Sequence, residues 1–150
     1  MPYLLDTSVL VRLANIRDPY HPAAANAVAC LHRQGESLHI TPQNLVEFRN
    51  AATRPTSVNG LGLTTVEAAS KAAIFEATFP LLEDASGIFP LWKLIVHNLD
   101  IAGKQVHDAR LVAVCHVYGV SHVLTFNLAH FIRLSAYGGG LIIVDPSTVH

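Results

Sequence analysis

Tyr3-Leu4-Leu5-Asp6-Thr7-Ser8-Val9-Leu10 is a stretch whose pattern changes at Asp6. The apolar run before Asp6 is short and suits a buried strand. Asp6, Thr7 and Ser8 carry side-chain oxygens of the kind that cap helix N-termini. Val9 and Leu10 then begin an apolar face with helical spacing. The stretch therefore predicts a strand that leads directly into a helix, with an acid at the junction.

The same alternation of strand and helix continues to the end of the chain. Helical patterns fill the segments between the apolar runs, among them Leu91 to Leu99 and about Gln105 to Tyr118. Thr41-Pro42 and Thr64–Glu67 have the residues that begin helices. Short, uniformly apolar strands that alternate with helices are typical of a parallel sheet covered by helices on both sides. We therefore predict an α/β fold with three layers, α/β/α. Its further strands are expected at Leu38–Ile40, Val123–Phe126 and Leu141–Val144, with a weaker one at Phe79–Leu82.

Length and composition predict one compact domain that spans residues 1–150, since the chain has 150 residues and no disordered tail is indicated. Only 14% of the residues are charged, below the quarter or so that is usual, so we expect a partner chain to cover part of an apolar surface. The formal net charge of -1 excludes a broadly basic nucleic-acid-binding surface. Any contact with RNA must be local.

Cys30 and Cys115 lie within apolar helical patterns, without the spacing of a metal site. Buried free thiols are favoured over a disulfide, and they fit a cytoplasmic protein. The N-terminus has no basic start and meets Asp6 at once, so no signal peptide is predicted. No apolar run approaches the roughly 18 residues of a membrane span, and we expect no membrane contact.

Acidic residues fall where an α/β protein forms its sites, at the carboxyl ends of the strands. Asp6 follows the first strand, Glu47 lies early in the helix after the second, and Asp108 lies early in the helix before Val123. Asn127 follows the strand that begins at Val123. These segments can converge on one edge of the sheet, where carboxylates suit magnesium or manganese.

A purely structural role is the alternative for each acid, because carboxylates after strands often only cap a helix or face its dipole. For any one of these acids taken alone, that role is favoured. Asp108 differs, because its neighbours Val106, Ala109 and Leu111 indicate a largely buried helix. An unpaired carboxylate there costs several kcal/mol, so Asp108 needs a partner such as a metal ion.

Four segments together resemble PIN domains and, within them, the VapC-like toxins of bacterial toxin–antitoxin pairs. The resemblance spans nearly the whole chain, and the closing Ile142–Pro146 is similar to the family's last strand and its exit. The four segments are Leu4–Leu10, Thr41–Phe48, Val106–Ala113 and Leu124–Phe131.

The resemblance implies a five-stranded parallel sheet and cleavage of RNA phosphodiesters, with Mg²⁺ or Mn²⁺ as cofactor and a 5′-phosphate and a 3′-hydroxyl as the new ends. It also implies a homodimer and an antitoxin similar to VapB, whose tail places a basic residue in the acidic pocket. Asp6, Glu47, Asp108 and Asn127 inherit the catalytic roles, with Asp6 and Asp108 as metal ligands and Thr7, Ser8 and Thr125 in support.

Two positions depart from the family pattern. Asn127 stands where an aspartate is frequent, so the pocket has one negative charge less. His130 stands where a second acid often precedes the phenylalanine, which argues against a second metal ion, and a surface or hydrogen-bonding role is favoured for it. For Arg110 a solvated side chain is favoured over a phosphate contact. His107 is disfavoured as a ligand, because the position next to Asp108 points about 100° away on a helix.

Two other classes of function stay open at this point. A non-catalytic module that binds RNA or a protein partner fits the uncharged Asn127 and the histidine at His130. A phosphatase or a DNA nuclease would use the same carboxylates on another substrate. Metal binding distinguishes the non-catalytic module from a nuclease. A panel of substrates distinguishes a phosphatase or a DNA nuclease from a ribonuclease.

Overall fold

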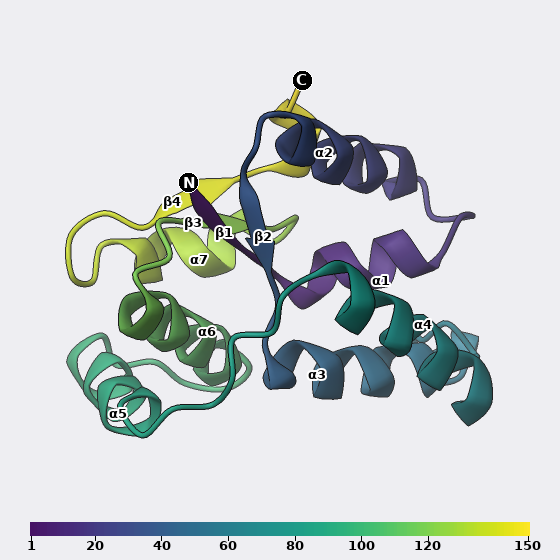
Figure 1. Ribbon diagram of the computed structural model, residues 1–150. Helices are drawn as coiled ribbons and strands as arrows, with labels where there is room; N and C mark the ends of the chain where they lie inside the picture. Colours follow the sequence, from purple (N-terminus) through teal and green to yellow (C-terminus); the bar gives the residue numbers. More distant parts are fainter.

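A parallel sheet forms the centre of the computed structural model, which describes residues 1–150. Its four strands are ordered β2-β1-β3-β4, and each neighbouring pair is parallel (Figure 1). The α/β fold with a parallel sheet, predicted from the alternating pattern, is confirmed. The strands are β1 (Pro2–Leu5), β2 (Ser37–His39), β3 (His122–Leu124) and β4 (Ile142–Val144).

Seven α-helices connect and cover these strands. Thr41 and Thr64 each begin a helix with a capping box. The sequence predicted the box at Thr64 and an N-cap at Thr41. The helices are α1 (Thr7–Ala14), α2 (His21–Arg33), α3 (Pro42–Thr53), α4 (Thr65–Thr78), α5 (Ile88–Asn98), α6 (Gln105–Tyr118) and α7 (Leu128–Ser135), with 3-10 turns η1 (Thr56–Val58) and η2 (Pro146–Thr148).

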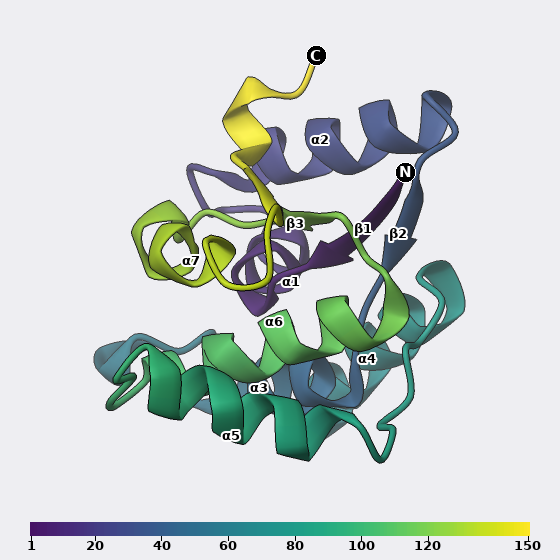
Figure 2. The same cartoon turned by 90° about the vertical axis from the view of Figure 1, so that its left-hand side faces the viewer.

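Successive residues of β1 face opposite sides of the sheet, as the pleat requires. Tyr3 and Leu5 join a core formed with residues of α1 to α4, whereas Leu4 joins a second core formed with α5, α6 and α7. Helices α5 and α6 lie side by side in both views (Figures 1 and 2). The two cores on either side of the sheet give the three layers that the sequence predicted.

The weak strand expected at Phe79–Leu82 is reduced to a single bridge between Ile40 and Leu81. The amide of Ile40 donates to the carbonyl of Pro80 at 3.1 Å, and the amide of Leu82 donates to the carbonyl of Ile40 at 2.8 Å. Pro80 has no N–H to donate, so pairing does not extend beyond this point. The sheet therefore has four strands where the family resemblance implied five.

None of the helices has the length and apolar character needed to cross a lipid bilayer. Both cysteines are buried and free, as predicted. Burial raises the pKa of the Cys115 thiol to about 12, so this cysteine is an uncharged core residue.

The carboxyl ends of β1, β3 and β4 lie at one edge of the sheet, because Leu5, Leu124 and Val144 stand next to one another in register. The hydrogen-bond ladder continues one residue further. The amide of Asp6 donates to the carbonyl of Leu124, and the amide of Thr125 donates to the carbonyl of Val144, both at 3.0 Å. The polar residues after these strands are thereby fixed beside one another.

Candidate active site

Asp6 is buried at this edge, with 4% of its surface exposed. Its Oδ2 accepts hydrogen bonds from the hydroxyls of Ser8 (2.7 Å) and Thr125 (2.8 Å), while its Oδ1 accepts none. Asp6 stands at the N-cap position of α1 but makes no side-chain cap bond. The capping role considered for Asp6 is therefore wrong, and its carboxylate is held by two hydroxyls instead.

The two hydroxyls are themselves fixed by backbone amides. Ser8 Oγ accepts from the amide of Phe126 at 3.2 Å, and Thr125 Oγ1 accepts from the amide of Asn127 at 2.9 Å. Because each hydroxyl accepts from an amide, its proton is free to point at Asp6. Ser8 and Thr125 thus connect the end of β1 with the turn between β3 and α7.

Glu47 reaches the same edge from the second turn of α3. The capping box between Thr41 and Asn44 fixes the start of that helix. The Asn44 side-chain amide donates to Thr7 Oγ1 at 3.1 Å, and the Thr7 hydroxyl donates to Glu47 Oε1 at 3.2 Å. This chain of hydrogen bonds places Glu47 against the residue that follows Asp6.

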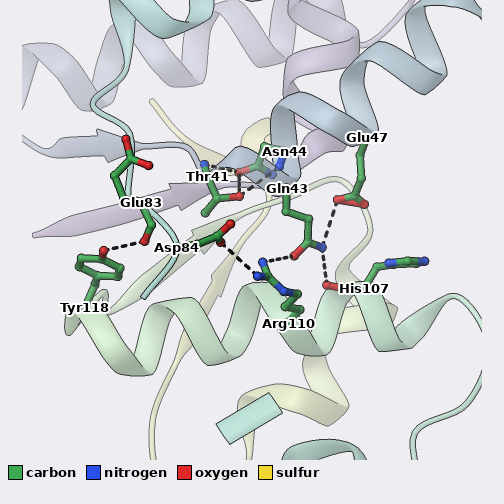
Figure 3. Close-up of polar contacts among 9 residues, drawn as sticks. All are labelled: Thr41, Gln43, Asn44, Glu47, Glu83, Asp84, His107, Arg110 and Tyr118. Atoms are coloured by element: carbon green, nitrogen blue, oxygen red, sulfur yellow. Dashed lines mark hydrogen bonds and ion pairs between the residues drawn. The ribbon is translucent and has the colours of Figure 1, made fainter. Parts of the chain in front are cut away.

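Gln43 connects α3 with α6, as Figure 3 shows. Its side-chain amide donates to Glu47 Oε1 at 3.3 Å and to the backbone carbonyl of His107 at 2.8 Å. Its Oε1 accepts from Arg110, whose guanidinium also pairs with Asp84 at 3.1 Å. Arg110 is therefore a partly exposed side chain that is held between Gln43 and Asp84.

Gln43 and Asn44 are the two polar residues of the site that were not selected from sequence. Gln43 precedes Glu47 by one helical turn, a spacing that brings side chains together on a helix surface. Asn44 has the position of the reciprocal partner in a capping box. Both signals were present in the Thr41–Phe48 segment.

Asp108 lies in the first turn of α6, with 17% of its side chain exposed. His130, the half-exposed residue for which a surface or hydrogen-bonding role was predicted, has its Nδ1 at 3.4 Å from Asp108 Oδ2. An imidazole carries a positive charge only when it is protonated. No lysine or arginine forms an ion pair with Asp108, Asp6 or Glu47.

The three carboxylates act on one another electrostatically. Burial, followed by the charges of Asp6 and Glu47, raises the pKa of the Asp108 carboxyl to about 7. Burial and the charge of Asp6 raise the pKa of the Glu47 carboxyl as well, although hydrogen bonds from Gln43 and Thr7 oppose that rise. Carboxylates from three separate segments therefore lie near one another at this edge of the sheet.

Carboxylate oxygens are the donors that Mg²⁺ and Mn²⁺ prefer, and the site has no lysine or arginine to neutralise it. Its chemistry therefore fits a divalent cation. In the conformation described, no group of three histidine, cysteine, aspartate or glutamate side chains is close enough together to hold an ion. Asn127 is exposed, and its backbone amide rather than its side chain contacts the site, through Thr125.

The protein has a central parallel sheet, and carboxylates lie at the carboxyl ends of its strands. It is therefore an α/β protein with an acidic site. The sequence model of the PIN domain matches residues 3–136. The chain therefore belongs to the PIN-domain family, which confirms the resemblance seen in the sequence. No curated protein sequence matches the chain.

Solved structures share this fold at low sequence identity. VapBC2 from Rickettsia felis, bound to a DNA fragment from its promoter, matches with a TM-score of 0.73 at 17% identity, over 97% of this chain and 98% of that chain. VapBC-1 from nontypeable Haemophilus influenzae matches with a TM-score of 0.70 at 14% identity, over 98% and 99%. The sarcin-ricin loop cleaving toxin VapC20 from Mycobacterium tuberculosis matches with a TM-score of 0.64 at 18% identity, over 85% and 92%.

Proposed function

We propose that this PIN domain is a metal-dependent endoribonuclease and the toxin of a VapBC-type toxin–antitoxin system. The similar structures support a toxin of this kind, since one of them is a toxin that cleaves the sarcin-ricin loop. The proposed reaction is hydrolysis of RNA phosphodiester bonds. The proposal takes the chain as one domain over residues 1–150 that works in the cytoplasm, where its substrate is found.

The raised pKa values of Asp108 and Glu47, in a cluster with Asp6, are the observation that carries this proposal. A protein gains no stability by gathering carboxylates whose charges raise the pKa of a neighbouring acid. Such an arrangement is common at functional sites, where a bound cation offsets the repulsion. The acids here lie at the edge of the sheet where α/β proteins form their sites.

Each residue has a role in this proposal that follows from its contacts. Asp6 and Asp108 hold a Mg²⁺ or Mn²⁺ ion, and such an ion polarises a phosphate oxygen and activates water when bound. Ser8 and Thr125 fix Asp6 through its Oδ2 and leave Oδ1 free for the cation. The backbone amide of Asn127 donates a hydrogen bond to Thr125 Oγ1 and so fixes that side chain.

Glu47 is the residue proposed to orient the attacking water. Its Oε1 already accepts hydrogen bonds from Thr7 and Gln43. Its Oε2 accepts none, so this oxygen is the one free to accept a proton from water. A raised pKa brings a carboxylate closer to the basicity that a general base needs near neutral pH.

Cleavage of a structured RNA by the purified protein, with Mn²⁺ or Mg²⁺ and with EDTA, tests the proposal. The wild-type protein should cleave only with metal and leave a 5′-phosphate and a 3′-hydroxyl. Asp6→Asn and Asp108→Asn should each remove the activity. Asp100→Asn is the matched control, because Asp100 is an exposed aspartate that forms no ion pair. Metal-dependent cleavage that persists in Asp6→Asn would contradict the proposal.

The proposed partners are an antitoxin similar to VapB and a second copy of the chain. The apolar faces of α2 and α4 mostly point into the core, since Ala27, Cys30, Ala72 and Phe75 are buried. Exposed apolar side chains remain on α3 and α4, and they support a homodimer: Val46, Val66 and Ile74. Light scattering of the wild-type protein and of Ile74→Glu tests the dimer.

A non-catalytic binding module is the second candidate function, and one contact favours it. His130 lies against Asp108, and in its protonated form it offsets charge that a cation would otherwise offset. Manganese separates the two functions, because an ion that binds the folded state raises the melting temperature. A melting temperature that does not respond to millimolar Mn²⁺, with no cleavage, would favour the binding module.

A further inference from the structure

A hollow lies next to the acidic site and has a different chemistry. Its volume is about 260 Å³, and it is lined by Arg12, Tyr20, Phe126, Asp145 and Ser147. Pockets for drug-sized ligands are generally larger, from about 300 Å³ upward. A hollow of this size suits one planar ring system better than a whole cofactor.

Two aromatic rings and a guanidinium form the wall of this hollow. The rings of Tyr20 and Phe126 lie with their centroids 5.6 Å apart and their planes inclined by 49°. The guanidinium carbon of Arg12 lies 4.8 Å from the centroid of Phe126 and 5.5 Å from that of Tyr20. Tyr20 remains 55% exposed, so its ring has a free surface on which a flat group can stack.

The positive charge of Arg12 has no acidic partner. Its Nη1 donates to the backbone carbonyl of Ser8 at 3.1 Å, its Nε has no partner, and no carboxylate forms an ion pair with it. Asp145 lines the same hollow, but its Oδ1 accepts from the amide of Ser147 at 2.9 Å. The guanidinium is therefore available for an anionic ligand.

Ser8 and the Thr125-Phe126 segment connect the hollow with the acidic site. Ser8 holds Asp6 with its hydroxyl and holds Arg12 with its carbonyl. Phe126 directly follows Thr125, the other residue that holds Asp6. Subsites for neighbouring units of one chain molecule would be connected in this way.

We propose that this hollow binds one nucleotide of an RNA substrate, next to the phosphate that is cleaved. The base stacks on the exposed ring of Tyr20 and contacts Phe126, the phosphate of that nucleotide faces Arg12, and the edge of the base that carries N–H groups faces Asp145. Aromatic and arginine surfaces are the usual platforms for unpaired RNA bases. The inference rests on the proposed ribonuclease function and names how that site selects single-stranded substrate.

Binding of a fluorescent single-stranded RNA hexanucleotide tests the stacking role. We place all variants in an Asp108→Asn background, which prevents cleavage, and measure anisotropy with and without Mn²⁺. Tyr20→Leu should weaken binding by about 5-fold or more, because one base–aromatic stack is worth roughly 1–3 kcal/mol. Tyr20→Phe keeps the ring and should bind normally. Phe89→Leu is the matched control, because Phe89 is also exposed and lies beneath a cation, Lys93.

Hexanucleotides with one abasic residue at each position in turn locate the base. At one position, the abasic residue should lower the affinity for the protein that retains Tyr20 but not the affinity for Tyr20→Leu. The two changes remove the same contact. Equal losses in both proteins at every position would overturn the inference. Displacement of the hexanucleotide by adenosine monophosphate at equal affinity would also overturn it, since the hollow would then be a site for free nucleotides.

The salt dependence of RNA binding tests whether the charge of Arg12 contacts a phosphate. Arg12→Gln should lower the slope of log affinity against log salt concentration by about 0.7, the value for one phosphate contact with a single strand. Arg33→Gln, at the far end of α2, should leave the slope unchanged. An unchanged slope in Arg12→Gln contradicts the phosphate contact.

The outcome for the hollow is separate from the outcome for the proposed function. If the native protein cleaves RNA with Mn²⁺ while Tyr20→Leu binds as tightly as the Phe89→Leu control, the inference fails and the ribonuclease stands. If the protein neither cleaves nor binds RNA, both fail. If Tyr20→Leu weakens binding in a protein that does not cleave RNA, the hollow is an RNA site and only the nuclease function fails.

Discussion

Thr125 donates a hydrogen bond from its hydroxyl to Oδ2 of Asp6 at 2.8 Å, although 119 positions separate the two residues in the sequence. Both are buried, and each follows a strand of the sheet, β3 and β1 respectively. Asp6 is thereby held by a residue of the neighbouring strand as well as by Ser8 of its own segment. The orientation of this carboxylate depends on the pairing of β1 with β3.

Thr125→Val removes this hydrogen bond and keeps the shape of the side chain. We expect the rate of metal-dependent RNA cleavage to fall by about 10-fold or more, the usual effect of losing a group that orients a metal ligand. The free energy of unfolding should fall by about 1 kcal/mol. Thr125→Ser retains the hydroxyl and should restore most of the rate. Thr148→Val, at an exposed threonine, is the control, and equal rates for it and Thr125→Val would show that the bond is not needed.

Asp108→Asn should stabilise the metal-free protein at pH 8. The pKa of this carboxyl is about 7 in the folded state, against 3.8 for an aspartate that is free in water. Between these two values the folded state binds more protons than the unfolded state, so the free energy of unfolding falls as the pH rises through this range. Above pH 7 the folded protein carries the full cost of the charge, and the amide removes that cost.

We expect a gain of about 2 kcal/mol at pH 8, or a rise in melting temperature of about 4–8 °C, and no gain below pH 4. Thermal unfolding in EDTA across this pH range measures the effect. For Asp84→Asn, at the exposed partner of Arg110, the difference in stability from the wild-type protein should not change with pH. A stability of Asp108→Asn that falls with pH as steeply as that of the wild-type protein would argue against a destabilising charge at Asp108.

Gln43→Leu should shift the pH dependence of cleavage. The hydrogen bond from Gln43 lowers the pKa of the Glu47 carboxyl, so its loss raises that pKa further. If cleavage requires ionised Glu47, the acidic limb of the rate profile moves to higher pH, and the rate recovers at alkaline pH. Gln34→Leu, at an exposed glutamine, is the control. A rate that falls equally at every pH would indicate a purely structural role for Gln43.

Asn127→Asp adds a negative charge at the position where the family pattern often has an aspartate. An aspartate here lies close to Thr125 and at the start of α7, where a helix dipole favours an anion. We expect Mn²⁺ to bind a few-fold more tightly, as measured by the rise in melting temperature during a titration. Asp145→Asn, at an acid of the neighbouring hollow, provides a comparison in which affinity should not rise. An unchanged affinity in Asn127→Asp would place this residue outside the metal site.

Local patterns were sufficient for most of the secondary structure. The capping residues Thr41 and Thr64 began helices as predicted, because a cap is satisfied by amides within the next turn. The helix expected from Gln105 to Tyr118 has those bounds. The helix expected from Leu91 starts earlier, at Ile88, since helix ends depend on neighbours that a local pattern does not include.

The partners of the charged side chains could not be predicted from the same patterns. Arg110 pairs with Asp84 and holds Gln43, and His130 contacts Asp108. None of these contacts has a sequence spacing that indicates it, because the two residues of each pair come from different elements. The prediction of a weak strand at Phe79–Leu82 failed for a related reason. A strand forms only where a neighbouring segment offers backbone groups with which it can pair.

The sequence by itself determined the order of strands and helices, the caps, and the placing of Asp6, Glu47 and Asp108 in segments that meet at the carboxyl edge of the sheet. These features depend on residues within one or two turns of one another. The tertiary structure alone decided that Thr125 holds Asp6, that neighbouring acids raise the pKa of Asp108 and of Glu47, and that Arg12, Tyr20 and Phe126 enclose a hollow beside them. Electrostatic and hydrogen-bond energies depend on distances through space, which the packing of the helices on the sheet fixes.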